Sequence, residues 1–589
     1  MKKVIRPRVL PDDTVLLPGM HPVLARLYAL RGVSSSVELE RALKGLVPAQ
    51  AMKGMEAALD LLQQALREDW RILVVGDFDA DGATSTVLAL RVLRALGAQQ
   101  VDYLVPNRFE YGYGLTPEIV ALAQREKAPD LIVTVDNGIS SIEGVAVAKA
   151  AGIRVLVTDH HLPGATLPVA DAIVNPNQPG CEFPSKNLAG VGVVFYLLSS
   201  LRTRLKNAGW FAEKNLPEVS LADYLDLVAL GTVADVVALD ANNRVLVHQG
   251  LARIRAGRCV PGISALLAVA GKRPEQLVAT DLGFQVAPRL NAAGRLDDMS
   301  HGIETLLTDS HELAAQYAAE LDGLNLDRRQ IEAGMQQEAL AALKHLKISA
   351  DTLPFAFSLF DASWHQGVIG ILAGRIKDKF HRPVIAFAPA GDDRNPATAE
   401  LKGSARSIPG VHIRDVLDLV AAKNPGLITR FGGHAMAAGL SLPLAHLTRF
   451  REAFNEAVKA VADRCDLEPV LHSDGELPPE CFSESFADLL RESGPWGQSF
   501  PEPLFHGEFL CLDQRLLKEK HIKLSVSHPA SNRVFDAIAF NVDREVWPNQ
   551  TRRVRLAYRL DINEFRGSRS LQLRVEYLEP LLDAISKPA

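Results

Sequence analysis

The sequence predicts an α/β protein with two lobes, a long helix that joins them and a small antiparallel barrel at the C-terminal end. Short apolar runs alternate with helical stretches from Arg71 onward and again after about residue 350, a pattern typical of βαβ units. The segment 310–346 contains no proline and only two glycines, which indicates one or two long amphipathic helices. From about His506, short strands alternate with turns, as in a small barrel.

The composition is that of a folded globular protein. The 589 residues are 47% hydrophobic and 23% charged, which excludes a disordered, collagenous or disulfide-scaffold chain. The sequence has no run of 18 apolar residues and no signal-peptide pattern, and its five cysteines form no CxxC pair. We therefore expect a cytoplasmic protein without a membrane partner. The net charge of −6, taken alone, argues weakly against a nucleic-acid substrate, although residues 506–589 carry +3.

The expected elements follow in order. Residues 1 to about 70 are expected to form a helical lead-in, with periodic apolar positions in Val37–Leu46 and Met55–Leu66. In the first lobe we expect strands at Ile72–Val75, Val101–Val105, Leu131–Val135 and Val155–Val157, and helices at Ala83–Leu96, Pro117–Glu126 and Ser141–Ala150. In the second lobe and the barrel we expect strands at Phe355–Phe360, Val384–Phe387, Lys523–Val526, Arg533–Phe540, Arg553–Leu560 and Leu571–Tyr577, and a helix near Val368–Lys379.

Three carboxylates follow the first strand at alternate positions. Asp77, Asp79 and Asp81 lie in the segment Gly-Asp-Phe-Asp-Ala-Asp-Gly, and small residues then open a helix. Three acids this close repel one another unless a cation lies among them. The alternative is an acidic loop that caps the helix, because a single Asp at an N-cap is common.

Further acids and histidines follow the next strands. Asp136 comes after Leu131–Val135, and Asp159, His160 and His161 come after Val155–Val157. Asp235 is a single acid in the apolar stretch 227–237, where it requires a cation or hydrogen-bond donors. Each of these signals also has a simpler explanation, such as a turn or a packed histidine.

Together, however, these residues predict one site at the carboxyl ends of parallel strands, where α/β sheets bind ligands. Carboxylate and imidazole ligands suit Mn²⁺, Mg²⁺, Zn²⁺ or Fe²⁺. Two ions about 3.5–4 Å apart would activate a water and stabilise an in-line attack on phosphorus. The residue types alone therefore predict metal-assisted phosphoester hydrolysis.

The same residues resemble a known family. Asp79 to Asp81, Asp136, Asp159 to His161 and Asp235 occur in the order of the four motifs of the DHH phosphoesterase superfamily. Further segments resemble the RecJ group of single-stranded-DNA exonucleases: Ala287–Arg295, Trp364–Gly370, Lys402–Ser407 and Gly432–Gly439. The resemblance implies a DHH catalytic domain at 51–308, a helical connector at 309–346, a DHH-associated substrate-binding domain at 347–465 and an OB-fold-like single-strand-binding domain within 466–589, after an N-terminal lead-in at 1–50.

The resemblance also implies an activity. Such enzymes remove nucleotides from the 5′ end of single-stranded DNA with Mn²⁺ or Mg²⁺, release 5′-mononucleotides and serve recombination and DNA repair. The partners implied are single-stranded DNA, a single-strand-binding protein and a helicase. A pyrophosphatase, an oligoribonuclease, a cyclic-dinucleotide phosphodiesterase and a catalytically inactive scaffold are alternatives, which the chain length and the intact acids disfavour.

The roles of individual residues follow from the same resemblance. Asp79, Asp81, Asp136, His160 and Asp235 are the foremost expected metal ligands, with Asp136 as a candidate bridge, while Asp77 and Asp159 are expected to be ligands or partners of ligands. His161 is expected to orient the phosphate or protonate the leaving oxygen.

The expected DNA contacts combine cations and flat side chains. Tyr113 can stack on a base. The resemblance implies a 5′-phosphate pocket formed by Arg108, Ser404 and Arg406. The other candidates are Arg289, Asn291, Arg295 and His434. The simpler alternatives are core packing for the rings and surface salt bridges for the arginines. In the barrel, Arg553, Arg555 and Arg559 alternate and are expected either to form a basic stripe or to lie on an ordinary solvated strand face.

Overall fold

A five-stranded parallel sheet forms the centre of the N-terminal half of the computed structural model. The strands are β2 (Ile72–Gly76), β3 (Val101–Leu104), β4 (Leu131–Val135), β5 (Arg154–Thr158) and β6 (Ala172–Val174), in the order β3-β2-β4-β5-β6. The four predicted strands are confirmed, and β6 was not predicted because it has only three residues. The central strands β2 and β4 are buried along their whole length, which explains their continuous apolar sequence.

The structure describes residues 3–107, 111, 113–345, 353–391, 399–462, 467–517, 520–531, 533–542, 547, 552–565 and 567–581. The chain forms two compact units. The large unit contains Arg8–Asn325 and Asp474–Ala589, and the small unit contains Met1–Pro7 and Leu326–Ser473. No helix in these described ranges is long and apolar enough to cross a membrane.

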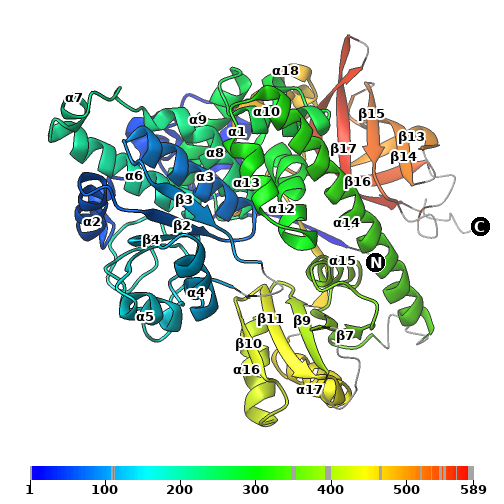
Figure 1. Ribbon diagram of the computed structural model, residues 1–589. Coiled ribbons are helices and arrows are strands. Elements are labelled where there is room, and N and C mark those ends of the chain that lie inside the picture. Colours follow the sequence, from blue (N-terminus) through cyan, green and yellow to red (C-terminus); the bar gives the residue numbers. More distant parts are fainter. Residues whose placement is uncertain are drawn as a thin grey trace, which may run out of the picture. The chain divides into compact units, whose positions relative to one another are not determined.

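Helices cover both faces of the parallel sheet. Figure 1 shows α3 (Ala80–Ala95) and α6 (Gly190–Asn207) on one face, and α4 (Pro117–Glu126) and α5 (Ile142–Ala150) on the other. Two apolar cores fill these layers, one on each side of the sheet. The crossover helices therefore leave the carboxyl ends of the strands as the edge where polar residues gather.

The lead-in is only partly helical. α1 (Pro22–Ala29) and α2 (Met55–Arg67) are helices, but the predicted helical stretch Val37–Leu46 is wrong. It forms two 3-10 turns, Ser36–Leu39 and Leu43–Gly45. The Glu40 carboxylate accepts the backbone N–H groups of Arg41 and Ala42, which competes with helix formation at this point.

A run of helices continues the large unit. It comprises α8 (Leu225–Ala234), α9 (Ala241–Arg255), α10 (Pro261–Val269), the π-helical turn η6 (Leu282–Val286), α12 (Ala287–Leu296) and α13 (Ser300–Leu307). A single helix, α14 (His311–His345), then runs from the large unit into the small unit, which confirms the predicted long helix.

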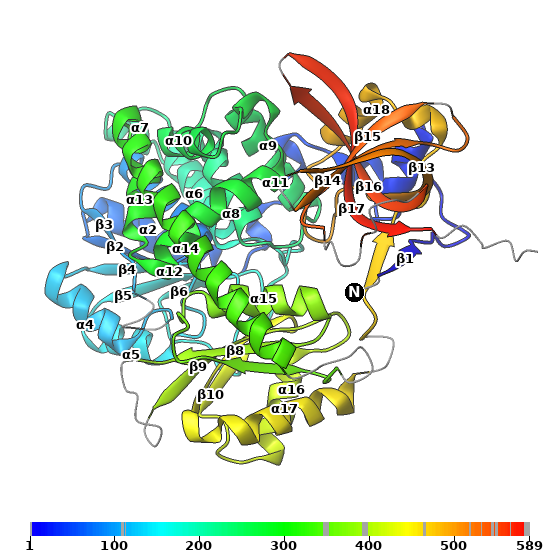
Figure 2. The same ribbon diagram turned by 90° about the vertical axis from the view of Figure 1, so that its right-hand side faces the viewer.

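The small unit contains a second sheet. Its order is β10-β11-β9-β8-β7, and only β7 and β8 pair in parallel. The strands are β7 (Phe357–Phe360), β8 (Val384–Pro389), β9 (Glu400–Arg406), β10 (Arg430–Gly433) and β11 (Ala437–Pro443). Figure 2 shows α15 (Ile369–Phe380) on one face, and α16 (Ile413–Lys423) and α17 (Leu447–Val461) on the other. The two predicted strands and the predicted helix are confirmed.

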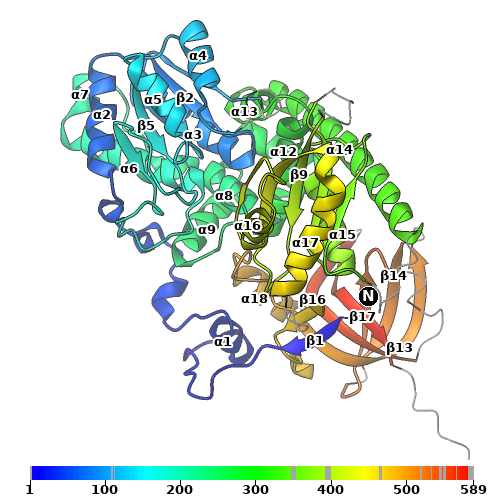
Figure 3. The ribbon, with the colours of Figure 1, turned by 90° about the horizontal axis from the view of Figure 1, so that it is seen from below.

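The C-terminal barrel is closed and has five strands in the order β13-β14-β15-β17-β16. They are β13 (Phe505–Leu517), β14 (His521–Ser527), β15 (Val534–Ala539), β16 (Arg553–Phe565) and β17 (Ser568–Pro580), coloured orange to red in Figure 3. Phe482, Phe509 and Tyr558 pack as a cluster of rings in its core. The barrel belongs to the large unit, in which the ring of Phe500 lies 4.2 Å from the Arg244 guanidinium of α9.

Candidate metal centre

The acidic loop after β2 is held by its own carboxylates. Asp79 is the N-cap of α3, and its Oδ1 accepts the backbone N–H groups of Asp81 and Gly82 at 2.9 and 3.0 Å. Asp81 is fully buried and accepts the N–H groups of Gly190 and Val191 at the start of α6, at 2.6 and 3.0 Å. Burial and the nearby charge of Asp79 nevertheless raise the pKa of Asp81 to about 7. Capping therefore explains one of the three acids, and an unbalanced negative charge remains.

Asp136 lies at the end of β4 in a strained conformation. Its φ is 63°, in the left-handed region, and its side chain is buried. Its Oδ1 lies 3.1 Å from His160 Nε2, and among the described residues it accepts no hydrogen bond. Burial and the charges of Asp81 and Asp79 raise its pKa well above the usual value. A Cβ at Gly190 would lie 2.6 Å from the Asp136 Cβ, so only glycine allows α6 to approach this closely.

Asp159 forms hydrogen bonds with the two histidines that follow it. Its Oδ1 accepts the backbone N–H groups of His160 and His161 and lies 2.8 Å from His161 Nδ1, while its Oδ2 accepts the N–H of Ile139. Burial opposes the ionisation of Asp159, but the hydrogen bond and charge of His161 outweigh it, so its pKa lies below the usual value. In turn, burial disfavours the charged form of His161, yet the hydrogen bond with Asp159 raises its pKa to about 9. This placement favours a positioning role for Asp159 over direct ligation.

Asp235 comes from a helix. It is the C-cap of α8, so the prediction that every acid follows a strand is wrong at this position. An uninterrupted apolar run cannot be assigned to a strand or a buried helix from periodicity alone. Asp235 Oδ2 lies 3.4 Å from His160 Nε2, and burial and the charge of Asp81 raise its pKa well above the usual value. The next residue, Val236, has a φ of 62°, which is rare for a β-branched side chain.

These side chains form three overlapping groups, within each of which the possible ligand atoms all lie within 4.8 Å of one another. The groups are Asp136, His160 and His161; Asp81, His160 and Asp235; and Asp77, Asp79 and Asp136. The groups contain five carboxylates, and burial raises the pKa of three of them, Asp81, Asp136 and Asp235. A divalent cation would stabilise their charged forms and the buried Asp136 oxygen that accepts no hydrogen bond among the described residues. The oxygen and imidazole donors fit Mn²⁺ or Mg²⁺.

Asparagines that the sequence did not single out support this edge. Asn177 Nδ2 donates to the His160 carbonyl at 2.6 Å, and Asn175 Nδ2 donates to the His161 carbonyl at 2.9 Å. Both follow β6, so they lie at the same sheet edge as the acids. Had β6 been recognised in the sequence, its polar end would have indicated them.

Tyr113 lies beside the centre. Its hydroxyl donates to the Asp136 carbonyl at 3.3 Å, and its ring contacts those of His161 and Phe78. The side chain is 47% exposed, which leaves surface for a ligand. The other candidate of this segment, Arg108, lies outside the described residues.

The candidates on α12 brace the acidic loop. Asn291 Oδ1 accepts the Ala80 N–H at 2.8 Å, and a Cβ at Gly294 would meet the Phe78 carbonyl oxygen at 1.9 Å. Arg289 is buried, with its guanidinium 2.8 Å from Asp322 of α14, a placement that favours a structural role over contact with phosphate. Arg295 is half-buried at the end of the helix.

The remaining candidates lie in the small unit. Arg406 Nη1 donates to Ser404 Oγ and to the Ala405 carbonyl, at 3.1 and 2.8 Å. Within the described ranges, no carboxylate lies within salt-bridge distance of Arg406, and burial lowers its pKa. A Cβ at Gly370 would lie 2.8 Å from Arg406 Nη2 and 2.9 Å from Ser404 Oγ. His434 is exposed beyond β10.

The basic stripe on the barrel is a row of ion pairs. Arg553 and Arg555 each lie 2.8 Å from Glu508. Arg559 lies 2.7 Å from Glu502 and 3.0 Å from Glu576. The prediction of a free basic stripe is therefore wrong, because acids on neighbouring segments neutralise it.

Comparisons with known proteins cover the whole molecule. Residues 71–232 match the DHH family N-terminal domain, residues 352–460 match the DHHA1 domain, and residues 473–577 match the RecJ OB domain. The chain is 56% identical to the "Single-stranded-DNA-specific exonuclease RecJ" of Dickeya dadantii over 99% of this chain and 100% of that protein.

Solved structures of RecJ proteins are also similar to this chain. The crystal structure of RecJ from Thermus thermophilus in complex with Mn²⁺ has a TM-score of 0.77 at 31% identity and covers 95% of this chain and 76% of that one. The corresponding complex with Mg²⁺ has a TM-score of 0.72 at 29% identity, over 95% and 75% of the two chains. With all three domains matched and more than half of its residues identical to a curated member, the chain belongs to the RecJ family.

Proposed function

We propose that this protein is a metal-dependent exonuclease that hydrolyses single-stranded DNA in the 5′→3′ direction to 5′-mononucleotides. The observation that carries the proposal is the cluster of five carboxylates and two histidines at one edge of the parallel sheet. The names of the family members support the substrate. The fit of the cluster to Mn²⁺ or Mg²⁺ supports phosphoester hydrolysis.

Two ions fit this cluster better than one. Asp136 belongs to two of the three ligand groups, which suits a carboxylate that bridges two ions, and His160 also belongs to two. We assign the ligands from Asp77, Asp79, Asp81, Asp136, His160 and Asp235. When bound, two divalent ions lower the pKa of a water and neutralise charge on the phosphate.

The protein's own groups then orient the reaction. Asp159 holds His161 through Nδ1, which directs the rest of the ring toward Tyr113 and the Asp136 end of the site. In the metal-free protein burial opposes protonation of His161, but the hydrogen bond with Asp159 raises its pKa to about 9. We infer that His161 donates a hydrogen bond to the phosphate or a proton to the leaving oxygen.

We propose that residues of the small unit determine the direction of digestion by binding the terminal phosphate. Arg406 and Ser404 form a half-buried donor pair without a carboxylate partner among the described residues, which suits a terminal phosphate. A pocket that binds the 5′-phosphate would determine which end of the strand enters. The barrel is assigned to hold the continuing strand. We propose further that the protein acts in recombination and DNA repair in the cytoplasm, and that its partners are a single-strand-binding protein and a helicase.

The test uses single-stranded DNA labelled at its 5′ or its 3′ end, with Mn²⁺ or Mg²⁺. The proposal predicts early release of the 5′ label as a mononucleotide, and no release after chelation. Early release of the 3′ label would contradict the direction. Hydrolysis of pyrophosphate or dinucleotides alone would contradict the substrate, and binding of the strand without hydrolysis would indicate a scaffold.

A further inference from the structure

Two exposed large apolar side chains line one cavity, and one of them directly follows Asp235 of the metal centre. Val236 follows Asp235 directly and is 62% exposed, and Phe284 on the π-helical turn η6 is 72% exposed. Both line a cavity of about 260 Å³ in the large unit, whose far wall contains Trp496. A cluster of exposed large apolar side chains commonly indicates a binding surface.

The backbone at this place is also unusual. Val236 is a β-branched residue with a φ of 62°, and Phe284 lies in a π-helical turn. Both features cost stability and are found preferentially at functional sites. Two independent backbone irregularities therefore occur where exposed apolar side chains line the same cavity.

The chemistry of the lining indicates the ligand. None of the residues that line this cavity is ionisable, so a phosphate is not the expected occupant. The apolar side chains of Val236, Phe284 and Trp496 suit a flat ring, and Thr280 and Gln498 add polar groups that suit the polar edge of such a ring. A nucleobase has this combination of apolar faces and a polar edge.

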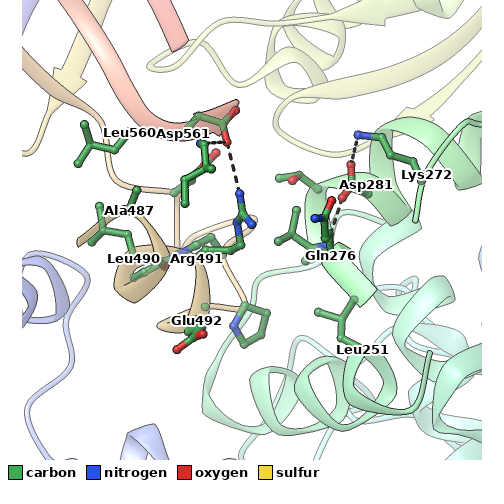
Figure 4. A pocket seen from close by; sticks show the side chains of 18 of the residues that line it. Leu251, Lys272, Gln276, Asp281, Ala487, Leu490, Arg491, Glu492, Leu560 and Asp561 are labelled. Atoms are coloured by element: carbon green, nitrogen blue, oxygen red, sulfur yellow. Dashed lines mark hydrogen bonds and ion pairs between the residues drawn. The ribbon is translucent and has the colours of Figure 1, made fainter. Parts of the chain in front are cut away.

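The cavity continues into a charged one. Ala279, Thr280 and Trp496 also line a cavity of about 390 Å³ that reaches barrel strand β16 at Leu560 and Asp561. Figure 4 shows Arg491 turned toward Asp561 and Lys272 turned toward Asp281. The Arg491–Asp561 separation of 3.7 Å is longer than a hydrogen bond.

Arg255 is another cation of this charged cavity, which five Lys or Arg and five Asp or Glu residues line. Its guanidinium donates to the Leu277 carbonyl and, among the described residues, has no carboxylate within salt-bridge distance. This cavity therefore carries no net formal charge, and the assignment of a nucleobase comes from the apolar cavity alone.

We propose that the cavity beneath Val236 and Phe284, the apolar seat, binds a nucleobase of the substrate strand beside the metal centre. The inference rests on the proposed nuclease function and adds positioning residues to it. Phe284 holds the base by stacking, and Val236 sets the position of the base relative to Asp235. A paired base cannot present both of its faces and its edge in this way, so the seat favours an unpaired strand.

The experiment replaces single bases in the DNA and Phe284 in the protein. In a set of single-stranded oligonucleotides, one abasic residue is placed at successive positions from the 5′ end. For the wild type, kcat/KM should fall about tenfold at one position, the loss expected for one stacked base. Phe284→Ala should lose about tenfold on the intact strand and nothing further at that abasic position. Phe284→Tyr should behave as the wild type, and Val147→Ala, a truncation of an exposed residue on α5, is the matched control.

A second measurement does not depend on turnover. With 2-aminopurine at the sensitive position and the metal chelated, binding should quench its fluorescence in the wild type and in Phe284→Tyr but not in Phe284→Ala. Losses that add between Phe284→Ala and the abasic substitution, or equal quenching in all three proteins, would overturn the apolar seat alone. Failure of the wild type to release nucleotides from any intact strand would overturn the proposed function on which the seat rests.

Discussion

The acidic edge of the parallel sheet and the outer strands of the barrel both carry dense charge, but only the barrel balances it internally. On β16, Arg553 and Arg555 share Glu508, and Arg559 lies between two glutamates. At the sheet edge, Asp136 and Asp235 meet the same histidine and have raised pKa values. Charge that is paired within the fold supports structure, whereas buried charge that is unpaired indicates a missing ligand.

The small unit also contains both paired and unpaired charged groups, but there the unpaired group is a cation. Arg406 is a half-buried cation without a carboxylate within salt-bridge distance among the residues that the structure describes. Arg382, in the same unit, is buried, and its guanidinium donates to the carbonyls of Pro354, His381 and Leu467. The uncompensated groups therefore have opposite charges in the two units: carboxylates in the large unit and a guanidinium in the small unit.

The largest expected effect comes from removing one carboxylate of the acidic edge. Asp136→Asn should lower the rate of nucleotide release at least roughly a thousandfold, because it removes the proposed bridge between two ions. The measurement is the release of 5′ label from single-stranded DNA. Asp130→Asn is the matched control, since Asp130 lies at the opposite end of β4 in an exposed pair with Arg71. Activity within tenfold of the wild type would remove Asp136 from the ligand set.

Arg406→Ala should have the next largest effect. Loss of a charge-assisted hydrogen bond should weaken the preference for a 5′-phosphorylated end by about 10- to 100-fold. The preference is measured as the ratio of kcat/KM for strands with and without the 5′-phosphate. Arg414→Ala is the control, because Arg414 is exposed on α16 beside Asp418. An unchanged ratio would exclude Arg406 from the pocket.

The metal-free protein should become less stable as the pH rises. The pKa of Asp81 is raised to about 7 in the fold, so between about pH 4 and pH 7 the folded state holds a proton that the unfolded chain has lost. His161, with a pKa raised to about 9, extends this loss of stability from about pH 6.5 to pH 9. The Tm measured in chelator should therefore fall across this range, and added Mn²⁺ should reduce the fall. A Tm that rises from pH 6 to pH 9 in chelator would contradict the uncompensated edge.

The smallest effect is expected on the barrel. Arg553→Ala should change single-strand affinity by less than about threefold, because that guanidinium is already paired with Glu508. Glu508→Gln should instead raise the affinity and steepen its dependence on salt, since it frees Arg553 and leaves Arg555 only the longer contact with Glu579, at 3.9 Å. Titration of a labelled oligonucleotide at two salt concentrations distinguishes these outcomes. A large loss in Arg553→Ala would restore the basic stripe.

Much of the fold was accessible from local patterns. The buried strands β2, β4 and β5 and the helices between them were predicted to within a few residues, because continuous apolar runs and helical periodicity arise from contacts close in sequence. The lead-in at Val37–Leu46 failed because the Glu40 carboxylate binds the backbone locally, a competition that apolar periodicity does not register.

By itself, the sequence determined that Asp77, Asp79, Asp81, Asp136 and His160 share one site, because polar residues at the ends of parallel strands must meet at one sheet edge. Only the tertiary structure decided the rest. It showed that the predicted ligand Asp235 comes from the end of a helix, paired Asp159 with His161 and Arg289 with Asp322, and paired the barrel arginines with glutamates. A charged side chain is either paired within the fold or available to bind a ligand. Which of the two holds depends on residues distant in the chain, so a local sequence pattern does not predict it.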